Sequence, residues 1–253
     1  MPKGQMFKTE SCLRRAGRIS VLIVLVVTLG ACATSPVGSH DVAAASLPDQ
    51  GDSGPFEWRY VRFRLKRAPD GETNSYLDGL IADRMLKPLI VRYGDELLLW
   101  RFHRRWPDDA TGHQFSLIFF TRPAVADALI ARLETDPLLQ RLKSDGHLIE
   151  FRVDRLGPDR ASDPAATSDT AWPIEIQREW PKFIMGASRM WLGLVDTEAE
   201  KHADLELHER YQAVEVALDD MWLRQGNHAF FHHLSALFGY KPVRVIRRDV
   251  MTF

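Results

Sequence analysis

Two hydrophobic periods alternate between residues 58 and 154, and this alternation restricts the fold more than any other feature of the chain. The segments 58–66, 98–106, 113–121 and 148–154 alternate apolar and polar side chains, which is the period of a half-buried strand. The segments 75–88 and 123–142 carry apolar residues three or four positions apart, which is the period of an amphipathic helix. The elements therefore follow one another as strand, helix, strand, strand, helix, strand.

This order predicts an α+β fold with the ferredoxin-like βαββαβ topology, in which both helices cover one face of an antiparallel sheet. Pro88 should kink or end the first helix, and the second should begin near Pro123, bend at Pro137 and stop at Gly146. Ser75, with Asp78 three residues later, resembles a helix start. The residues expected to face the core are Val61, Phe63, Leu65, Leu98, Trp100, Phe102, Phe115, Leu117, Phe119, Ile149, Phe151 and Val153.

The predicted α+β domain spans residues 56–156 and is followed by two segments of different composition. Residues 157–170 are rich in Asp, Ser, Ala and Pro and predict a polar loop. Residues 171–253 predict a helical extension packed on the sheet, with a last helix that ends at Gly239 and a short strand at 243–246. Three apolar stripes are expected to be buried: Phe183, Ile184, Ala187, Trp191 and Leu194 after Pro181; Tyr211, Val214, Leu218, Met221 and Trp222; and Phe230, Phe231, Leu234, Leu237 and Phe238.

The N-terminal segment has the composition of an export signal. Five basic residues and one acidic residue precede an apolar run from Ile19 to Leu29. As a helix this run would reach roughly 16 Å, about half of the ~30 Å hydrocarbon core of a bilayer. The run closes on Leu29-Gly30-Ala31-Cys32, which resembles the lipobox of bacterial lipoproteins. The resemblance implies a signal peptide at residues 1–31 and a diacylglyceryl group on Cys32, with residues 32–55 as a flexible tether.

The lipobox resemblance also implies a location and restricts the chemistry. Ala33 after the cysteine is the pattern that accompanies export to the outer membrane, so we expect an anchored protein that faces the periplasm. The other cysteine, Cys12, lies in the segment expected to be removed, which leaves no free thiol for a disulfide, a thiolate metal site or a nucleophile. The remaining 28 basic and 33 acidic residues do not suggest a nucleic-acid binder.

One face of the predicted sheet is strongly basic. Arg62, Arg64, Arg101, His103, Arg105 and Arg152 all point away from the core, with only Glu150 in opposition. Two alternatives would neutralise this face: the acidic residues of the C-terminal helices cover it, or it binds an anionic ligand, because arginine forks match carboxylate and phosphate. Coverage by the helices is the favoured interpretation, since such charges usually lie in water or in pairs.

Histidines are dense near the C-terminus. His228 and His232 lie four residues apart, so on a helix they would share a face, as a metal or haem site needs. Phe230 and Phe231 lie among them and no carboxylate follows at a fixed ligand spacing. Surface histidines are the more usual interpretation, and no cofactor is predicted.

A second resemblance concerns the folded part. The stretches Trp58–Phe63, Leu99–Phe102 and His113–Leu117 resemble the C-terminal thiopeptide-type domain of lantibiotic dehydratases. The arginine-tyrosine-glycine-glycine stretch of that family is absent after the last strand, and its compartment differs from the periplasm expected for this chain. The resemblance therefore implies a fold and none of the family's chemistry.

Three function classes follow from these observations. The first is a non-enzymatic binding or assembly module of the envelope, lipid-anchored through Cys32. The second is a binder of anionic small molecules or polymers that uses the arginine-rich face. The third is an enzyme with a histidine-centred site.

Overall fold

The computed structural model describes residues 55–68, 71, 73–105 and 110–241, which belong to one compact unit, Pro48–Phe253. Its sheet consists of β1 (Glu57–Leu65), β2 (Leu99–Arg104), β3 (Gln114–Thr121) and β4 (Leu148–Arg155). The strand order is β2-β3-β1-β4 and every neighbouring pair is antiparallel. The predicted ferredoxin-like topology is confirmed.

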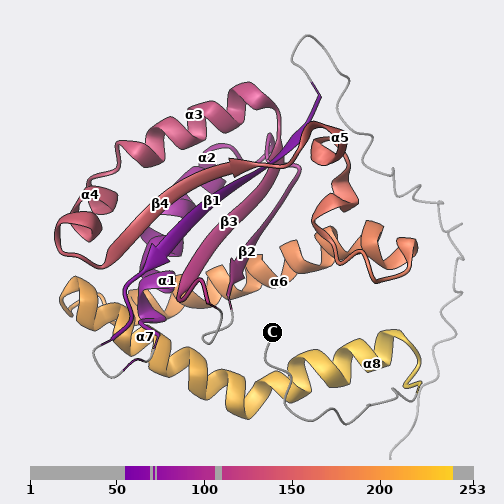
Figure 1. Ribbon diagram of the computed structural model, residues 1–253. Coiled ribbons are helices and arrows are strands. Elements are labelled where there is room, and N and C mark those ends of the chain that lie inside the picture. The colour runs from indigo at the N-terminus through magenta and orange to yellow at the C-terminus, as the bar shows by residue number, and fades with distance from the viewer. Residues whose placement is uncertain (1–54, 69–70, 72, 106–109, 242–253) are drawn as a thin grey trace, which may run out of the picture. The chain divides into compact units, whose positions relative to one another are not determined.

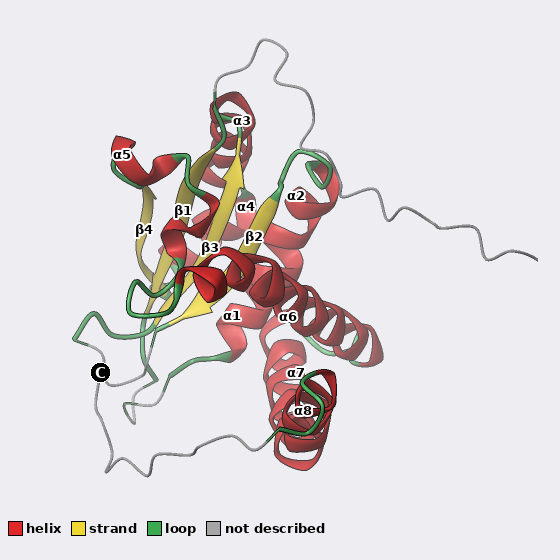
Figure 2. Cartoon of the chain, turned by 90° about the vertical axis from the view of Figure 1, so that its right-hand side faces the viewer, coloured by secondary structure: helices red, strands yellow, loops and turns green. Residues whose placement is uncertain are grey.

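Helices cover one face of this sheet (Figures 1 and 2). They are α1 (Tyr76–Ile81), the π-helical segment η1 (Ala82–Leu86) and α2 (Lys87–Arg92), followed after the hairpin by α3 (Pro123–Glu134) and α4 (Pro137–Ser144). Ser75 occupies the N-cap position of α1. The helical run does not end at Pro88, as one alternative predicted, but continues from η1 through α2 to Arg92. Gly146, with φ +71°, closes α4 as expected.

The core lies between the sheet and these helices. Val61 of β1 is opposite Leu117 of β3 and Val153 of β4, and the register places Phe63 opposite Phe115 and Phe151. Val61, Phe63, Phe115, Leu117 and Phe119 are all fully buried, so the predicted register of β1 and β3 is confirmed.

Two inward-facing predictions are wrong. The pairing of β4 with β1 shifts between Arg64 and Leu65, so that Leu148 enters the core and Ile149 is 55% exposed. The irregularity changes the alternation only at the start of β4, since Phe151 and Val153 still pack against the core, and simple alternation does not reveal it. Before β2, Leu97 is the buried core residue, and Leu98 packs in a smaller cluster on the opposite face of the sheet.

The segment predicted as a polar loop at 157–170 contains two short helices, α5 (Pro158–Ala161) and η2 (Pro164–Thr167). They lie on the face of the sheet opposite α1–α4 (Figure 2). Ala166 packs there with Trp58, Ile118 and Phe120, and the Trp58 indole donates a hydrogen bond to the Asp163 carbonyl at 2.9 Å. This segment is therefore part of the fold and covers the part of that face formed by Trp58, Ile118 and Phe120.

Helix α6 (Ile174–Lys201) begins before Pro181, contrary to the prediction that the helix follows the proline. A proline inside a helix leaves the carbonyl four residues earlier, here that of Gln177, without its N–H partner. The Ser168 hydroxyl donates to this carbonyl at 2.7 Å. Ser168, the residue after η2, thus satisfies the group that Pro181 leaves unbonded, and the helix continues through the proline.

The inward stripe of α6 is displaced by about one residue from the prediction. Ser188, Leu192, Val195 and Ala199 are buried, whereas Phe183 is 42% exposed and Trp191 and Leu194 are half-buried. Ser188 accepts a hydrogen bond from the Phe102 N–H of the edge strand β2 at 3.1 Å. Its hydroxyl therefore satisfies a group that an edge strand leaves open, and this contact fixes the rotation of α6.

Helix α7 (Leu207–Met221) packs on α1 and α6 and continues into the π-helical segment η3 (Trp222–His232) and α8 (His233–Leu237). Of the predicted stripe, Tyr211, Val214 and Leu218 are buried, whereas Met221 is half-buried and Trp222 is 58% exposed. The later stripe is not buried, because Phe231, Leu237 and Phe238 are 68%, 82% and 72% exposed. Gly239, with φ +69°, ends the helical course as predicted.

Other predictions lie outside the described residues, including the signal peptide, Cys32, the tether up to residue 54 and the short strand at 243–246. Within the described ranges, no helix is both long enough and apolar enough to cross a bilayer.

Candidate functional site

A large cavity lies where α6, α7 and η3 meet, and we call it the interhelical pocket. Its volume is about 590 Å³, which is within the range of small-molecule sites. Most of its wall is apolar, and a few polar groups converge at one end. The lining residues are Arg104, Ala187, Met190, Trp191, Leu194, Glu215, Leu218, Asp219, Met221, Trp222, Gln225, Gly226, Ala229 and Phe230.

Glycine at position 226 shapes the wall that η3 supplies. Trp222, Gly226 and Phe230 are spaced four residues apart, and the Trp222 and Phe230 rings are 5.4 Å apart. A Cβ at position 226 would lie 2.7 Å from Cε3 of the Trp222 ring. Any larger residue would therefore displace this indole, whose residue is 58% exposed.

The polar end of the pocket is an ionic network that joins the partly exposed Arg104 to buried Asp78. Arg104 lies on the core side of β2, and its Nε is 2.8 Å from Oδ2 of the fully buried Asp78 in α1. The other Asp78 oxygen lies 2.9 Å from Nε2 of His113, which is 3% exposed. Asp78 thus holds the Arg104 guanidinium at the polar end of the pocket.

Glu215 of α7 is the carboxylate that this arrangement satisfies least. It approaches Arg104 only to 3.8 Å, and the Arg104 guanidinium stacks over Trp191 with Cζ 5.0 Å from the ring centroid. Burial raises the pKa of Glu215; Asp219 and Asp78 raise it further, while Arg104 opposes the shift. A desolvated carboxylate beside aromatic rings is a group able to bind a ligand.

The second candidate is the sheet face opposite α1–α4, which we call the far face. The sequence places six basic side chains on it, and the structure gives three of them acidic partners on β4, two across strands and one within β4 itself. Arg62 and Arg152 share Asp154, at 3.2 and 3.0 Å, and Arg64 lies 3.7 Å from Glu150. Cross-strand pairs within the sheet therefore neutralise part of this face.

The remaining basic residues of the far face lie along β2. Arg101 donates to the Thr167 carbonyl of η2 at 3.1 Å, and burial lowers its pKa. The pKa of the His103 imidazole is also lowered, first by burial and then by the positive charges of Arg101, Arg105 and Arg62. The far face therefore keeps a positive potential near His103, although part of its charge is paired.

The favoured expectation that acidic residues of the C-terminal helices cover the far face is wrong. The cover comes from α5 and η2, and their contacts to Trp58 and Arg101 use backbone carbonyls. Acidic residues of α6 and α7 form ion pairs elsewhere, for example Glu198 with Lys201 and Glu215 with Arg104. The charge composition of the C-terminal helices could not predict that α6 would pack along the edge strand β2.

The histidine candidates lie on η3. The His228 and His232 rings stack with centroids 5.0 Å apart, and His233 lies 5.0 and 5.2 Å from them. Among the described residues, no group of three or more histidines and carboxylates is placed to hold a metal ion. The predicted shared face is present, and the structure gives the metal interpretation no support.

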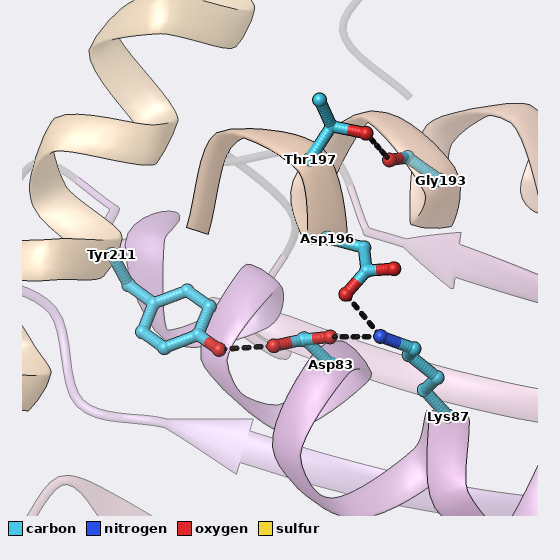
Figure 3. Close-up of polar contacts among 6 residues, drawn as sticks. All are labelled: Asp83, Lys87, Gly193, Asp196, Thr197 and Tyr211. Atoms are coloured by element: carbon cyan, nitrogen blue, oxygen red, sulfur yellow. Dashed lines mark hydrogen bonds and ion pairs between the residues drawn. The ribbon is translucent and has the colours of Figure 1, made fainter. Parts of the chain in front are cut away.

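A third polar cluster joins η1, α2, α6 and α7 (Figure 3). The Tyr211 hydroxyl donates to Asp83, and Lys87 pairs with both Asp83, at 3.2 Å, and Asp196. Burial and the bond to Asp83 raise the pKa of Tyr211. Burial alone would lower the pKa of Lys87, but the hydrogen bonds to Asp196 and Asp83 raise it overall. These groups satisfy one another and connect the helical extension to α1–α2.

Sequence reasoning missed the polar end of the interhelical pocket. Arg104 follows Trp100 and Phe102 at alternate positions, so its inward orientation could have been found from the strand period. Asp78 resembled a helix-start carboxylate and is instead a buried partner of His113 and Arg104. Glu215 carried no local signal, because its role depends on how α7 packs.

Comparisons with known proteins provide a fold likeness only. No family model and no curated protein matches this chain. One similar solved structure is a dimeric ferredoxin-like protein from an uncultured marine organism, 18% identical, with a TM-score of 0.30 over 41% of this chain and 94% of that chain. Another is a protein from Pseudomonas aeruginosa, 17% identical, with a TM-score of 0.26 over 42% of this chain and 96% of that chain.

Proposed function

We propose that the protein is a non-enzymatic ligand-binding module of the bacterial envelope, held at the periplasmic side of the outer membrane by a lipid on Cys32. The observation that carries the binding function is the interhelical pocket, which combines an apolar wall with a few convergent polar groups. One wall is the π-helical segment η3, a conformation that is rare and frequent at functional sites.

Anchoring rests on the Leu29–Cys32 pattern and has its own test. Each buried methylene contributes about 0.8 kcal/mol, so two or three acyl chains would hold the protein firmly. The Cys32→Ser variant should lose acyl labelling and accumulate as a precursor in cells. Normal processing and labelling of that variant would refute the anchor and leave the pocket proposal intact.

The binding function is tested with an uncharged fluorescent probe, N-phenyl-1-naphthylamine, titrated into the full chain. We expect saturable fluorescence enhancement that Gly226→Ala weakens severalfold, because the added methyl displaces Trp222. Gly186→Ala is the matched control, since a Cβ there meets no atom within 4 Å. Absence of saturable binding, or equal binding by both variants and the parent, would refute the pocket as the site.

A second candidate function, anion binding on the far face, is favoured by the positive charges around His103. Inorganic polyphosphate should then raise the melting temperature by mass action, and the rise should fade with salt. Arg62→Glu is a suitable variant because Arg62 is one of the positive charges that act on His103, and its side chain is partly exposed. A rise that persists in this variant or at high salt would exclude the far face.

A further inference from the structure

We propose that the interhelical pocket binds an organic cation with an apolar body, such as an alkylammonium group. This inference rests on the proposed binding function and names the ligand class of the same pocket. It follows from the balance of charges at the polar end and from the aromatic rings that surround it.

Carboxylates outnumber cations at this end of the pocket. Glu215 and Asp219 are four residues apart on α7 and both line the cavity, and Asp78 lies directly below. The guanidinium of Arg104 is the opposing charge among the lining residues, and it is engaged by Asp78 at 2.8 Å. Glu215, 3.8 Å from Arg104, can therefore accept a positive group from the pocket side.

Aromatic rings complete the environment that such a group prefers. A cation is attracted to the face of an indole or phenyl ring, most strongly where water is excluded. Arg104 already stacks over Trp191 in this manner, with Cζ 5.0 Å from the centroid. Trp222 and Phe230 line the same cavity beyond it, and their rings are 5.4 Å apart. A second cation can thus meet aromatic rings and the carboxylates of α7 together.

The shape and composition of the pocket require the remainder of the ligand to be apolar. The wall between the polar end and η3 is formed by side chains such as Leu194, Leu218 and Met221. A small hydrated cation would leave this surface unfilled, whereas an alkyl or aryl substituent would bury it. A free amphipathic amine and the ammonium headgroup of a lipid share this chemistry.

The test compares three octyl compounds below their micellar concentrations: octyltrimethylammonium, octyl glucoside and octyl sulfate. Binding to the full chain is measured by isothermal titration. We expect the ammonium compound to bind about tenfold more tightly than the glucoside. Glu215→Gln and the more exposed Asp219→Asn should each weaken ammonium binding by a larger factor than glucoside binding, with melting curves confirming that both variants fold.

The outcomes separate this inference from the function on which it rests. Equal binding of ammonium and glucoside, or tightest binding of the sulfate, would overturn the cation and leave a pocket that binds ligands. No binding of any octyl compound would contradict both. Phosphatidylethanolamine vesicles decide the source: cosedimentation lost in Glu215→Gln supports a lipid headgroup, and binding of the soluble ammonium alone supports a free amine.

Discussion

Helix α7 carries an apolar stripe, and so do the segments η3 and α8 that continue it, but only the stripe of α7 is buried. Tyr211, Val214 and Leu218 are at most 9% exposed, because α1 and α6 pack against them. Leu223, Phe231 and Leu237 are 68–82% exposed. Side-chain spacing defines a stripe, but burial depends on a partner surface, and no described element covers η3 and α8.

The largest expected contrast is between core and outer-stripe leucines. Leu117→Ala removes a fully buried side chain of β3 and should lower the free energy of unfolding by roughly 2–5 kcal/mol. Leu237→Ala, at a position that is 82% exposed, should change it by less than about 0.5 kcal/mol. Urea unfolding of both variants measures the contrast. Similar losses would mean that α8 is packed in solution.

The polar attachment of α7 should be the next largest effect. Tyr211→Phe keeps the packed ring but removes the hydroxyl that donates to the buried Asp83, which should cost about 1–3 kcal/mol. Thr197→Ala removes an exposed hydroxyl that donates to the Gly193 carbonyl within α6 (Figure 3), and should change stability by less than about 0.5 kcal/mol. Equal effects would show that the Tyr211–Asp83 bond contributes nothing to the attachment.

The continuity of α6 at Pro181 should depend on Ser168, the residue after η2. Ser168→Ala removes the donor to the Gln177 carbonyl and should cost about 1 kcal/mol. In a Pro181→Ala background the helix regains its own N–H, so the same substitution should cost less. Thermal unfolding of the two single variants and the double variant provides the cycle. Additive losses would mean that Ser168 and Pro181 act independently.

The smallest effect concerns the far face and acid. The folded-state pKa of His103 lies below its unfolded value of about 6.5, so the folded state binds fewer protons. Its stabilising contribution is therefore present above pH 6.5 and is lost as the pH falls toward the lower folded-state value. His103→Gln should flatten the loss of stability between about pH 7 and pH 5 by a few tenths of a kcal/mol. A steeper loss in the variant would contradict the lowered pKa of His103.

The sequence was sufficient to predict the sheet because the strand period reports directly on burial. Val61, Phe63 and Leu117 needed no information beyond alternation. Ile149 was misassigned because a bulge depends on pairing with β1. Helix α6 passes through Pro181 because the hydroxyl of Ser168, which lies before the helix, donates to the Gln177 carbonyl. This contact joins two separate segments and leaves no local sequence pattern. The interhelical pocket was missed for the same reason, since it forms between β2, α6, α7 and η3.

The central claim is that η3 forms one wall of a ligand site, and amide hydrogen exchange tests it most directly. Octyltrimethylammonium should slow exchange in residues 222–232 and at the end of α7, where the pocket lining lies, and leave β1 and β4 unchanged. Slower exchange confined to the far-face strands, or no change at saturating ligand, would contradict the claim.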